Sequence, residues 1–129
     1  MAFIQLALIP VLTAIAISPP KHHKPSPYEL EVQKEAREIV SIKPNPYYSK
    51  KGADKIFWFY FIHNISSCGF PSDSTEEGDF WVSTPHIGYT GEPSKHPMRL
   101  HKSTGRISWE SGPTYDSILA LTQAAIKKQ

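Results

Sequence analysis

The chain has 129 residues and a formal net charge of +2, with its charged residues spread along its length. About 110 residues follow an apolar N-terminal stretch, which is enough for one hydrophobic core and too few for two. The low, dispersed charge excludes a nucleic-acid footprint and an acidic tail. Cys68 is the only cysteine, so an intrachain disulfide is excluded as well.

Residues 2–17 are uncharged and mostly apolar. The run is shorter than the roughly 20 apolar residues of a membrane-spanning helix, and the small residues Ala14 and Ala16 suit cleavage by signal peptidase. We therefore expect residues 1–18 to be a signal peptide and the protein to be exported, either to the periplasm or by secretion. An uncleaved membrane anchor is the alternative, because no Lys or Arg precedes the run. Residues 19–27 are rich in proline and predict an extended linker.

A helix is predicted directly after the linker. Ser26 can cap it, Pro27 suits the first helical position, and Glu29 completes a capping box with Ser26. Apolar residues then recur at helical spacing, at Tyr28, Val32, Ala36, Ile39 and Val40. The pattern predicts an amphipathic helix over 27–42, which ends before Pro44 because the residue that precedes a proline disfavours helical geometry.

The segment from Ile56 to Ile62 is apolar at every position and contains five aromatic residues. This composition predicts a buried β-strand. Such a strand would place Trp58, Tyr60 and Ile62 on one face and Phe57, Phe59 and Phe61 on the other. The polar segment 64–78 is expected to be a long loop, and a second strand is expected from Phe80 to about Tyr89, with Pro85 and Gly88 marking a bulge or an edge.

Residues 98–109 predict a β-hairpin. Met98 and Leu100 alternate with polar residues, Ile107 and Trp109 do the same, and Gly105 can supply a positive φ at the turn. Residues 90–97 are expected to form a loop, and residues 114–128 a terminal helix. The sequence therefore predicts an α+β fold, in which an N-terminal helix packs on a small antiparallel sheet of about four strands. Residues 28–129 are expected to form one such domain.

No catalytic motif is evident, and we expect the protein to be neither an enzyme nor a cofactor or metal carrier. Cys68 could pair with His63 or His86 as nucleophile and base, but their spacing does not place them within hydrogen-bond reach. His86, His96 and His101 lack the tight spacing of metal ligands. An incidental loop cysteine and exposed strand histidines are the favoured interpretations.

The two long loops are the expected binding regions, because loops held by a rigid scaffold often carry function. The first loop contains acidic residues that could meet a basic partner, at Asp73, Glu76, Glu77 and Asp79. Aromatic and arginine side chains beside the loops are the expected anchors, at Phe70, Tyr89 and Arg99.

Three segments carry a resemblance to known families: Gly78–Val82, the turn Gly88–Gly91, and above all Leu100–Trp109. They resemble the strand and hairpin of small bacterial immunity proteins of the nuclear-transport-factor-like type, and of PepSY-like domains. The resemblance implies a non-enzymatic protein that binds and blocks a toxin, or that inhibits or senses an exported enzyme. We expect another protein as partner, no nucleic acid, and membrane contact only through an uncleaved N-terminus. The alternative is an accessory or structural subunit tethered to a membrane by that segment.

Overall fold

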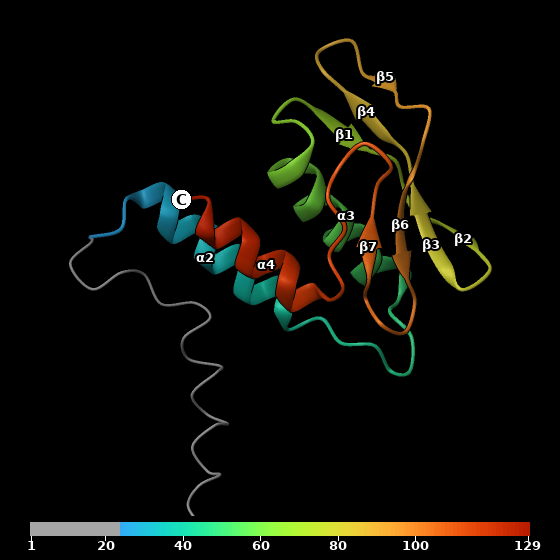
Figure 1. Cartoon of the computed structure of the whole chain (residues 1–129), viewed down its shortest axis with the longest axis horizontal. Helices are drawn as coiled ribbons and strands as arrows, with labels where there is room; N and C mark the ends of the chain where they lie inside the picture. Colours follow the sequence, from blue (N-terminus) through green and yellow to red (C-terminus); the bar gives the residue numbers. More distant parts are fainter. Residues whose placement is uncertain (1–23) are drawn as a thin grey trace, which may run out of the picture.

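The computed structural model describes residues 24–129, which form three helices and two antiparallel sheets (Figure 1). The predicted α+β class is confirmed. The expected signal peptide or anchor, and residues 19–23 of the expected linker, lie outside the described residues. The helices are α2 (Pro27–Val40), α3 (Lys50–Asn64) and α4 (Ile118–Lys127).

The first sheet has the strand order β1 (Gly69–Pro71), β4 (Pro85–Ile87), β5 (Glu92–Pro93). The second has the order β2 (Thr75–Glu77), β3 (Phe80–Ser83), β6 (Met98–His101), β7 (Ile107–Ser108). The expected strand from Phe80 to Tyr89 is thus divided between the two sheets. Segments 64–78 and 90–97, expected to be loops, contain β1, β2 and β5. These edge strands are only two or three residues long, which is too short for hydrophobic alternation to appear in the sequence.

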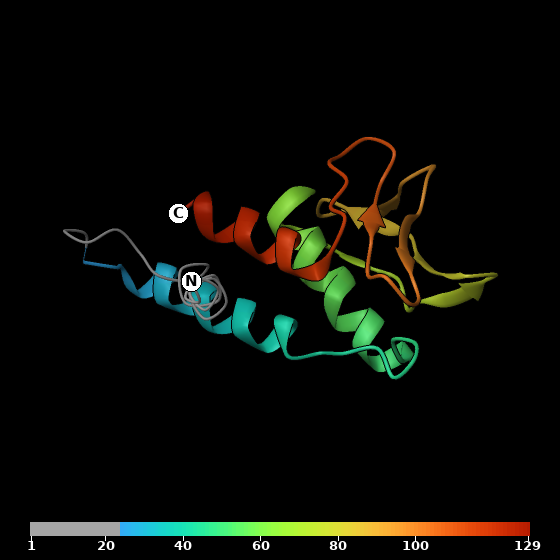
Figure 2. The same cartoon turned by 60° about the horizontal axis from the view of Figure 1, so that its bottom comes forward.

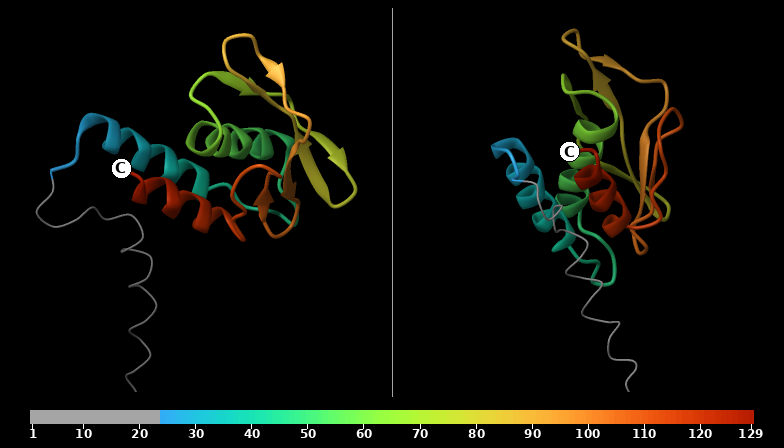
Figure 3. Two further views of the ribbon diagram at one scale, coloured as in Figure 1. Left: turned by 45° about the horizontal axis from the view of Figure 1, so that its top comes forward. Right: turned by 60° about the vertical axis from the view of Figure 1, so that its left-hand side comes forward.

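The elements form layers, with all three helices on one side of the strands (Figure 3). Helix α3 lies against the strands and contacts β1, β3 and β6. Helices α2 and α4 run antiparallel, side by side, and both contact α3 (Figures 1 and 2). The amphipathic helix α2 therefore buries Val32, Ala36 and Ile39 mainly against other helices.

The start of α2 agrees with the sequence-based prediction. The Ser26 hydroxyl accepts a hydrogen bond from the Glu29 amide at 3.1 Å, and the Glu29 carboxylate accepts one from the Ser26 amide at 2.7 Å. Each bond satisfies an amide that has no partner within the helix. This local bonding explains why the first turn of the helix could be predicted from four residues.

The strand predicted over 56–62 is wrong, because these residues belong to helix α3. The helix begins six residues earlier, where the Ser49 hydroxyl caps the Gly52 amide, and Lys50 pairs with Asp54 one turn later. Tertiary contacts surround most of α3, so apolar residues occur on nearly all sides and the helical period disappears from the sequence. A continuous apolar run does not distinguish a buried strand from a buried helix.

The predicted hairpin is confirmed as β6 and β7. Leu100 lies opposite Ile107 and both are buried, while Arg99 lies opposite Ser108 on the other face. Gly105 has φ +78°, and a Cβ there would lie 3.1 Å from atoms of Tyr48 and Ile118. Glycine is therefore required both by the backbone and by the close packing.

The expected terminal helix is present as α4, which begins later than expected, after the cap Ser117. Tyr115, two residues before this cap, pairs with Ile107 in a β-bridge. None of the helices in residues 24–129 is both long enough and apolar enough to cross a membrane.

Substitutions in α3 distinguish the helix from the predicted strand. A strand would give Trp58 and Tyr60 the same environment, whereas the helix leaves Trp58 44% exposed and Tyr60 fully buried. We expect Tyr60→Ala to lower the free energy of unfolding by about 3–5 kcal/mol, since it also removes the hydrogen bond from the Tyr60 hydroxyl to the Pro113 carbonyl. Trp58→Ala should cost about 1 kcal/mol or less.

Urea denaturation of both variants, at low micromolar protein concentration, measures this difference. Phe57→Ala is the positive control, because Phe57 is also fully buried. Equal losses for Trp58→Ala and Tyr60→Ala would contradict the helical assignment.

Candidate binding surface

The four-stranded sheet has one face covered by helix α3 and one face turned away from the helices (Figure 3). Residues directly opposite one another in paired strands share a face, and so do alternate residues along each strand. This places Trp81, Leu100 and Ile107 on the side of α3. The residues on the other side, which we call the outer face, are Thr75, Glu77, Phe80, Val82, Arg99, His101 and Ser108.

Arg99 is held in place at the centre of the outer face. Its guanidinium donates a hydrogen bond to the Glu77 carboxylate at 2.6 Å and lies over the Phe80 ring, 4.4 Å from the ring centroid. The His101 ring makes a T-shaped contact with the same phenyl ring, with the ring centroids 5.1 Å apart. The Arg99 side chain is 38% exposed. The arrangement orients an arginine toward solvent without covering it.

A second ion pair lies on the opposite side of the same strands. The Lys102 ammonium is 2.7 Å from the Glu76 carboxylate and 5.3 Å from the centroid of the Trp81 ring. Glu76 and Glu77 are thus both paired with cations of β6 or its turn. Within residues 24–129, Asp73 and Asp79 make no ion pair, so these two carboxylates carry the unneutralised charge of the expected acidic loop.

The seven residues expected to bind a partner lie in different parts of the structure, on both sheets and in the connections between strands. Glu76, Glu77 and Arg99 are on the four-stranded sheet, while Asp73 and Asp79 lie in the connections before and after β2. Phe70 is on β1 of the other sheet, where its ring stacks on His86 at 4.7 Å. Tyr89, in the turn between β4 and β5, is 97% exposed.

Phe80 and His101 complete the surroundings of Arg99, and neither was predicted from the sequence as a partner-binding residue. The sequence indicates that His101 shares a face with Arg99, because these two polar residues alternate with the buried Met98 and Leu100 along β6. The cross-strand register that brings Phe80 to them could not be inferred from one strand alone.

The histidines considered as catalytic bases are engaged with groups other than Cys68. The His86 Nδ1 atom is 3.0 Å from the Gly91 carbonyl oxygen. His63, in the last turn of α3, packs its ring on Phe59 at 4.4 Å. Among residues 24–129, no three His, Cys, Asp or Glu side chains are close enough together to hold a metal ion.

No protein-family model matches the sequence, and comparison with curated proteins and with solved structures finds no significant match. The resemblance to immunity proteins and PepSY-like domains stays a prediction from the sequence.

His63 is a buried titratable group outside the outer face. Its side chain is 5% exposed, and its Nε2 atom has no hydrogen-bond partner but lies 3.8 Å from the Glu35 carboxylate. Burial lowers the pKa of the imidazole, and the nearby Lys128 ammonium lowers it further. The folded protein therefore resists protonation of His63 more strongly than the unfolded chain does.

This pKa shift predicts acid sensitivity. The unfolded chain binds a proton at His63 near the ordinary value of about 6.5, so stability should fall as the pH drops below that value, by at most about 1.4 kcal/mol per pH unit for one group. Between about pH 6.5 and 5, His63→Gln should show a shallower decline in the free energy of unfolding than the wild type does.

Lys128→Gln provides the matched variant, since it keeps the imidazole but removes the cation bonded to the His63 carbonyl. Its decline should be intermediate. Identical pH dependence in all three proteins, measured by denaturation at each pH, would show that His63 does not produce the effect.

Proposed function

We propose that the protein is a small exported, non-enzymatic binding protein that occludes a partner protein, as an immunity or inhibitor protein does. The observation that carries the proposal is the oriented Arg99 on the outer face, held between the Glu77 carboxylate and the Phe80 ring. Arginine and aromatic residues are enriched among the side chains that contribute most to binding.

Preordering supports this role on energetic grounds. Fixing a flexible side chain on association costs about 0.5–1.5 kcal/mol, and Arg99 is already oriented in the free protein by its two neighbours. The guanidinium has five N–H donors, and only one of its nitrogens bonds to Glu77. Donors therefore remain for acceptor groups of a partner, next to the apolar surface of Phe80.

The acidic residues have different roles in this proposal. Glu77 positions Arg99, whereas Asp73 and Asp79 remain available to attract a basic region at the rim of the partner's surface. Charges at a rim mainly raise the rate of association and contribute little to final affinity. The proposed partner thus combines an acceptor and an apolar group at its centre with basic residues at its edge.

The proposal is tested with the exported chain immobilised and exposed to extract from its native source. A partner should bind the wild type and should lose about 30-fold or more in affinity, equivalent to roughly 2 kcal/mol, when Arg99→Ala or Phe80→Ala removes an anchor. Arg106→Ala is the matched control, because Arg106 is also exposed, on the same hairpin, and is paired with Asp116.

Melting of each variant must first show an intact fold. A partner that binds Arg99→Ala, Phe80→Ala and the wild type equally would contradict the proposed surface. Asp73→Asn with Asp79→Asn should slow association at low salt while leaving the dissociation rate nearly unchanged.

The proposed location rests on residues 1–18, outside the part of the chain that the structure describes. Mass spectrometry of the mature N-terminus tests it. A chain that begins near Ile17 is expected for the exported binding protein. An intact Met1 in the membrane fraction would contradict export as a free protein, and would favour the membrane-tethered accessory subunit.

A further inference from the structure

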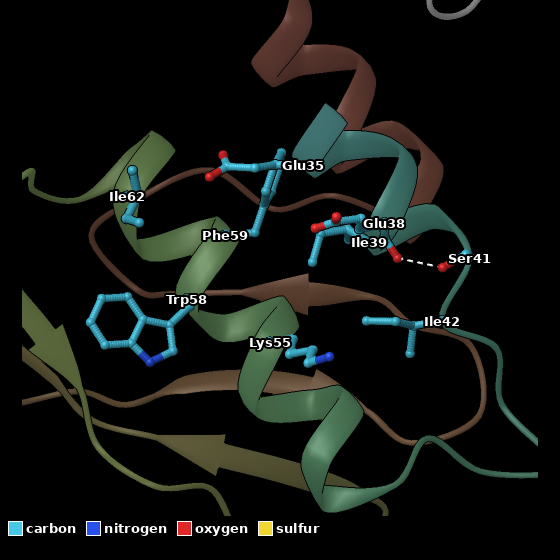
Figure 4. Close-up of a pocket in the computed structure, with 9 residues that line it drawn as sticks. All are labelled: Glu35, Glu38, Ile39, Ser41, Ile42, Lys55, Trp58, Phe59 and Ile62. Atoms are coloured by element: carbon cyan, nitrogen blue, oxygen red, sulfur yellow. Dashed lines mark hydrogen bonds between the residues drawn. The ribbon is translucent and has the colours of Figure 1, made fainter. Parts of the chain in front are cut away.

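Helices α2 and α3 enclose an open groove of about 570 Å³ (Figure 4). Its floor is apolar and includes the buried side chains of Ile39 and Phe59. On the α3 wall, Trp58 and Ile62 lie one helical turn apart and are 44% and 43% exposed. Large apolar side chains that stay exposed together at a groove are typical of an interaction surface.

The α2 wall of the groove is acidic. Glu31, Glu35 and Glu38 are exposed and follow one another at spacings of four and three residues, so they form a single row, which we call the acidic stripe. Glu35 and Glu38 line the groove directly. In the part of the chain that the structure describes, none of the three carboxylates forms an ion pair with a lysine or an arginine, although Lys34 and Arg37 are on the same helix. The stripe therefore keeps its negative charge.

Glu35 shows how unfavourable this arrangement is in the free protein. Burial raises the pKa of its carboxyl, and the charges of Glu31 and Glu38 raise it further. The Nε2 atom of His63 lies 3.8 Å from the Glu35 carboxylate, on a side chain that is only 5% exposed, and it has no hydrogen-bond partner among the described residues. Burial and the charge of Lys128 lower the pKa of this imidazole, so at neutral pH it does not supply the missing positive charge. A cation that enters the groove would reduce the repulsion within the stripe.

The two walls are antiparallel, which gives the groove a basic end and an acidic end. Ile42, just after α2, contacts Gly52 near the start of α3. Lys55 lines the groove on the same side as Ile42 (Figure 4), whereas Glu35 lies at the other end, beside His63. An occupant therefore meets negative charge along α2 and the positive charge of Lys55 at one end of α3.

The walls favour a helical occupant over an extended one. Both walls are helices, whose central backbone groups bond within their own helix and offer nothing to a neighbouring backbone. An extended chain would leave amides and carbonyls unpaired on the apolar floor, at a cost of about 1–3 kcal/mol for each. A helix satisfies these groups internally. Docking of an amphipathic helix in an apolar groove is also a recurring mode of recognition.

We propose that this groove binds an amphipathic helix of a partner protein, with lysine or arginine side chains along one flank of that helix. Its apolar face would cover Trp58, Ile62 and the floor of the groove, and its basic flank would lie along the acidic stripe. The opposite flank carries no cation at the level of Lys55. Such a helix would bury the exposed apolar side chains and neutralise the stripe in one step.

Other occupants fit the charges less well. Nucleic acid and anionic lipid head groups would bring phosphates against the acidic stripe, and an uncharged apolar ligand would leave the stripe without cations. The groove is formed by α2 and α3, whereas the outer face belongs to the four-stranded sheet. The inference therefore does not depend on the proposed function.

Two synthetic peptides test the proposal. Both are fluorescently labelled, helix-forming and about 18 residues long, since shorter isolated helices are marginal in water. They share a leucine face, and they differ only in that one has lysines along a flank where the other has glutamates. By fluorescence anisotropy with the isolated chain at low salt, we expect the lysine peptide to bind and the glutamate peptide to bind at least about tenfold more weakly. The difference should shrink as salt is added, because salt screens exposed charges.

Substitutions on each wall locate the binding site. Glu35→Gln with Glu38→Gln should weaken binding of the lysine peptide by about fivefold or more, and Trp58→Ala by about tenfold or more, with the fold intact by circular dichroism. Glu92→Gln with Glu110→Gln is the matched control, because it makes the same change in net charge at exposed positions that do not line the groove. The control should bind the lysine peptide as the wild type does.

Three results would overturn the proposal. The first is a wild type that does not bind the lysine peptide at several hundred micromolar, and the second is equal binding of the two peptides. The third is a loss of affinity in the control pair as large as that in the groove variants. Sedimentation equilibrium of the chain alone checks for a different occupant. A chain that associates with itself through Trp58 and excludes the peptide would assign the groove to a second copy instead.

Discussion

The burial of helix α3 on almost all sides is the constraint on which the rest of the structure depends. Its aromatic residues Phe57, Tyr60 and Phe61 are buried, and the helix contacts both other helices and strands of both sheets. Burial of an aromatic side chain contributes several kcal/mol. Helix α3 therefore supplies the apolar centre that the helices and both sheets share.

Polar side chains join the outer elements to this centre. Asp54, in the first turns of α3, accepts a hydrogen bond from the Ser74 amide ahead of β2, and the Tyr60 hydroxyl bonds to the carbonyl of Pro113. From the interior strand β3, the Trp81 indole donates a hydrogen bond to the carbonyl of Tyr48, just before α3. Such bonds contribute about 1 kcal/mol each, so their main role is to set where the short strands lie relative to the helix.

The two candidate surfaces follow from this arrangement. Helix α3 occupies the inner face of the four-stranded sheet, which leaves the outer face to Arg99 and its neighbours. Helices α2 and α4 cover only part of the apolar surface of α3, so Trp58 and Ile62 stay exposed beside the groove. One surface is built from an oriented cation on an aromatic ring, and the other from apolar side chains between opposite charges.

Short-range interactions are what the sequence by itself determined. The capping box of α2 joins Ser26 and Glu29, three residues apart, and the hairpin of β6 and β7 is specified by alternation and by Gly105 at its turn. The tertiary structure alone decided that residues 56–62 are helical, because packing on all sides of α3 conceals its period. It alone also brought Arg99 to Glu77 and Phe80, since these contacts depend on the register of β6 with β3, two strands that are distant in the chain.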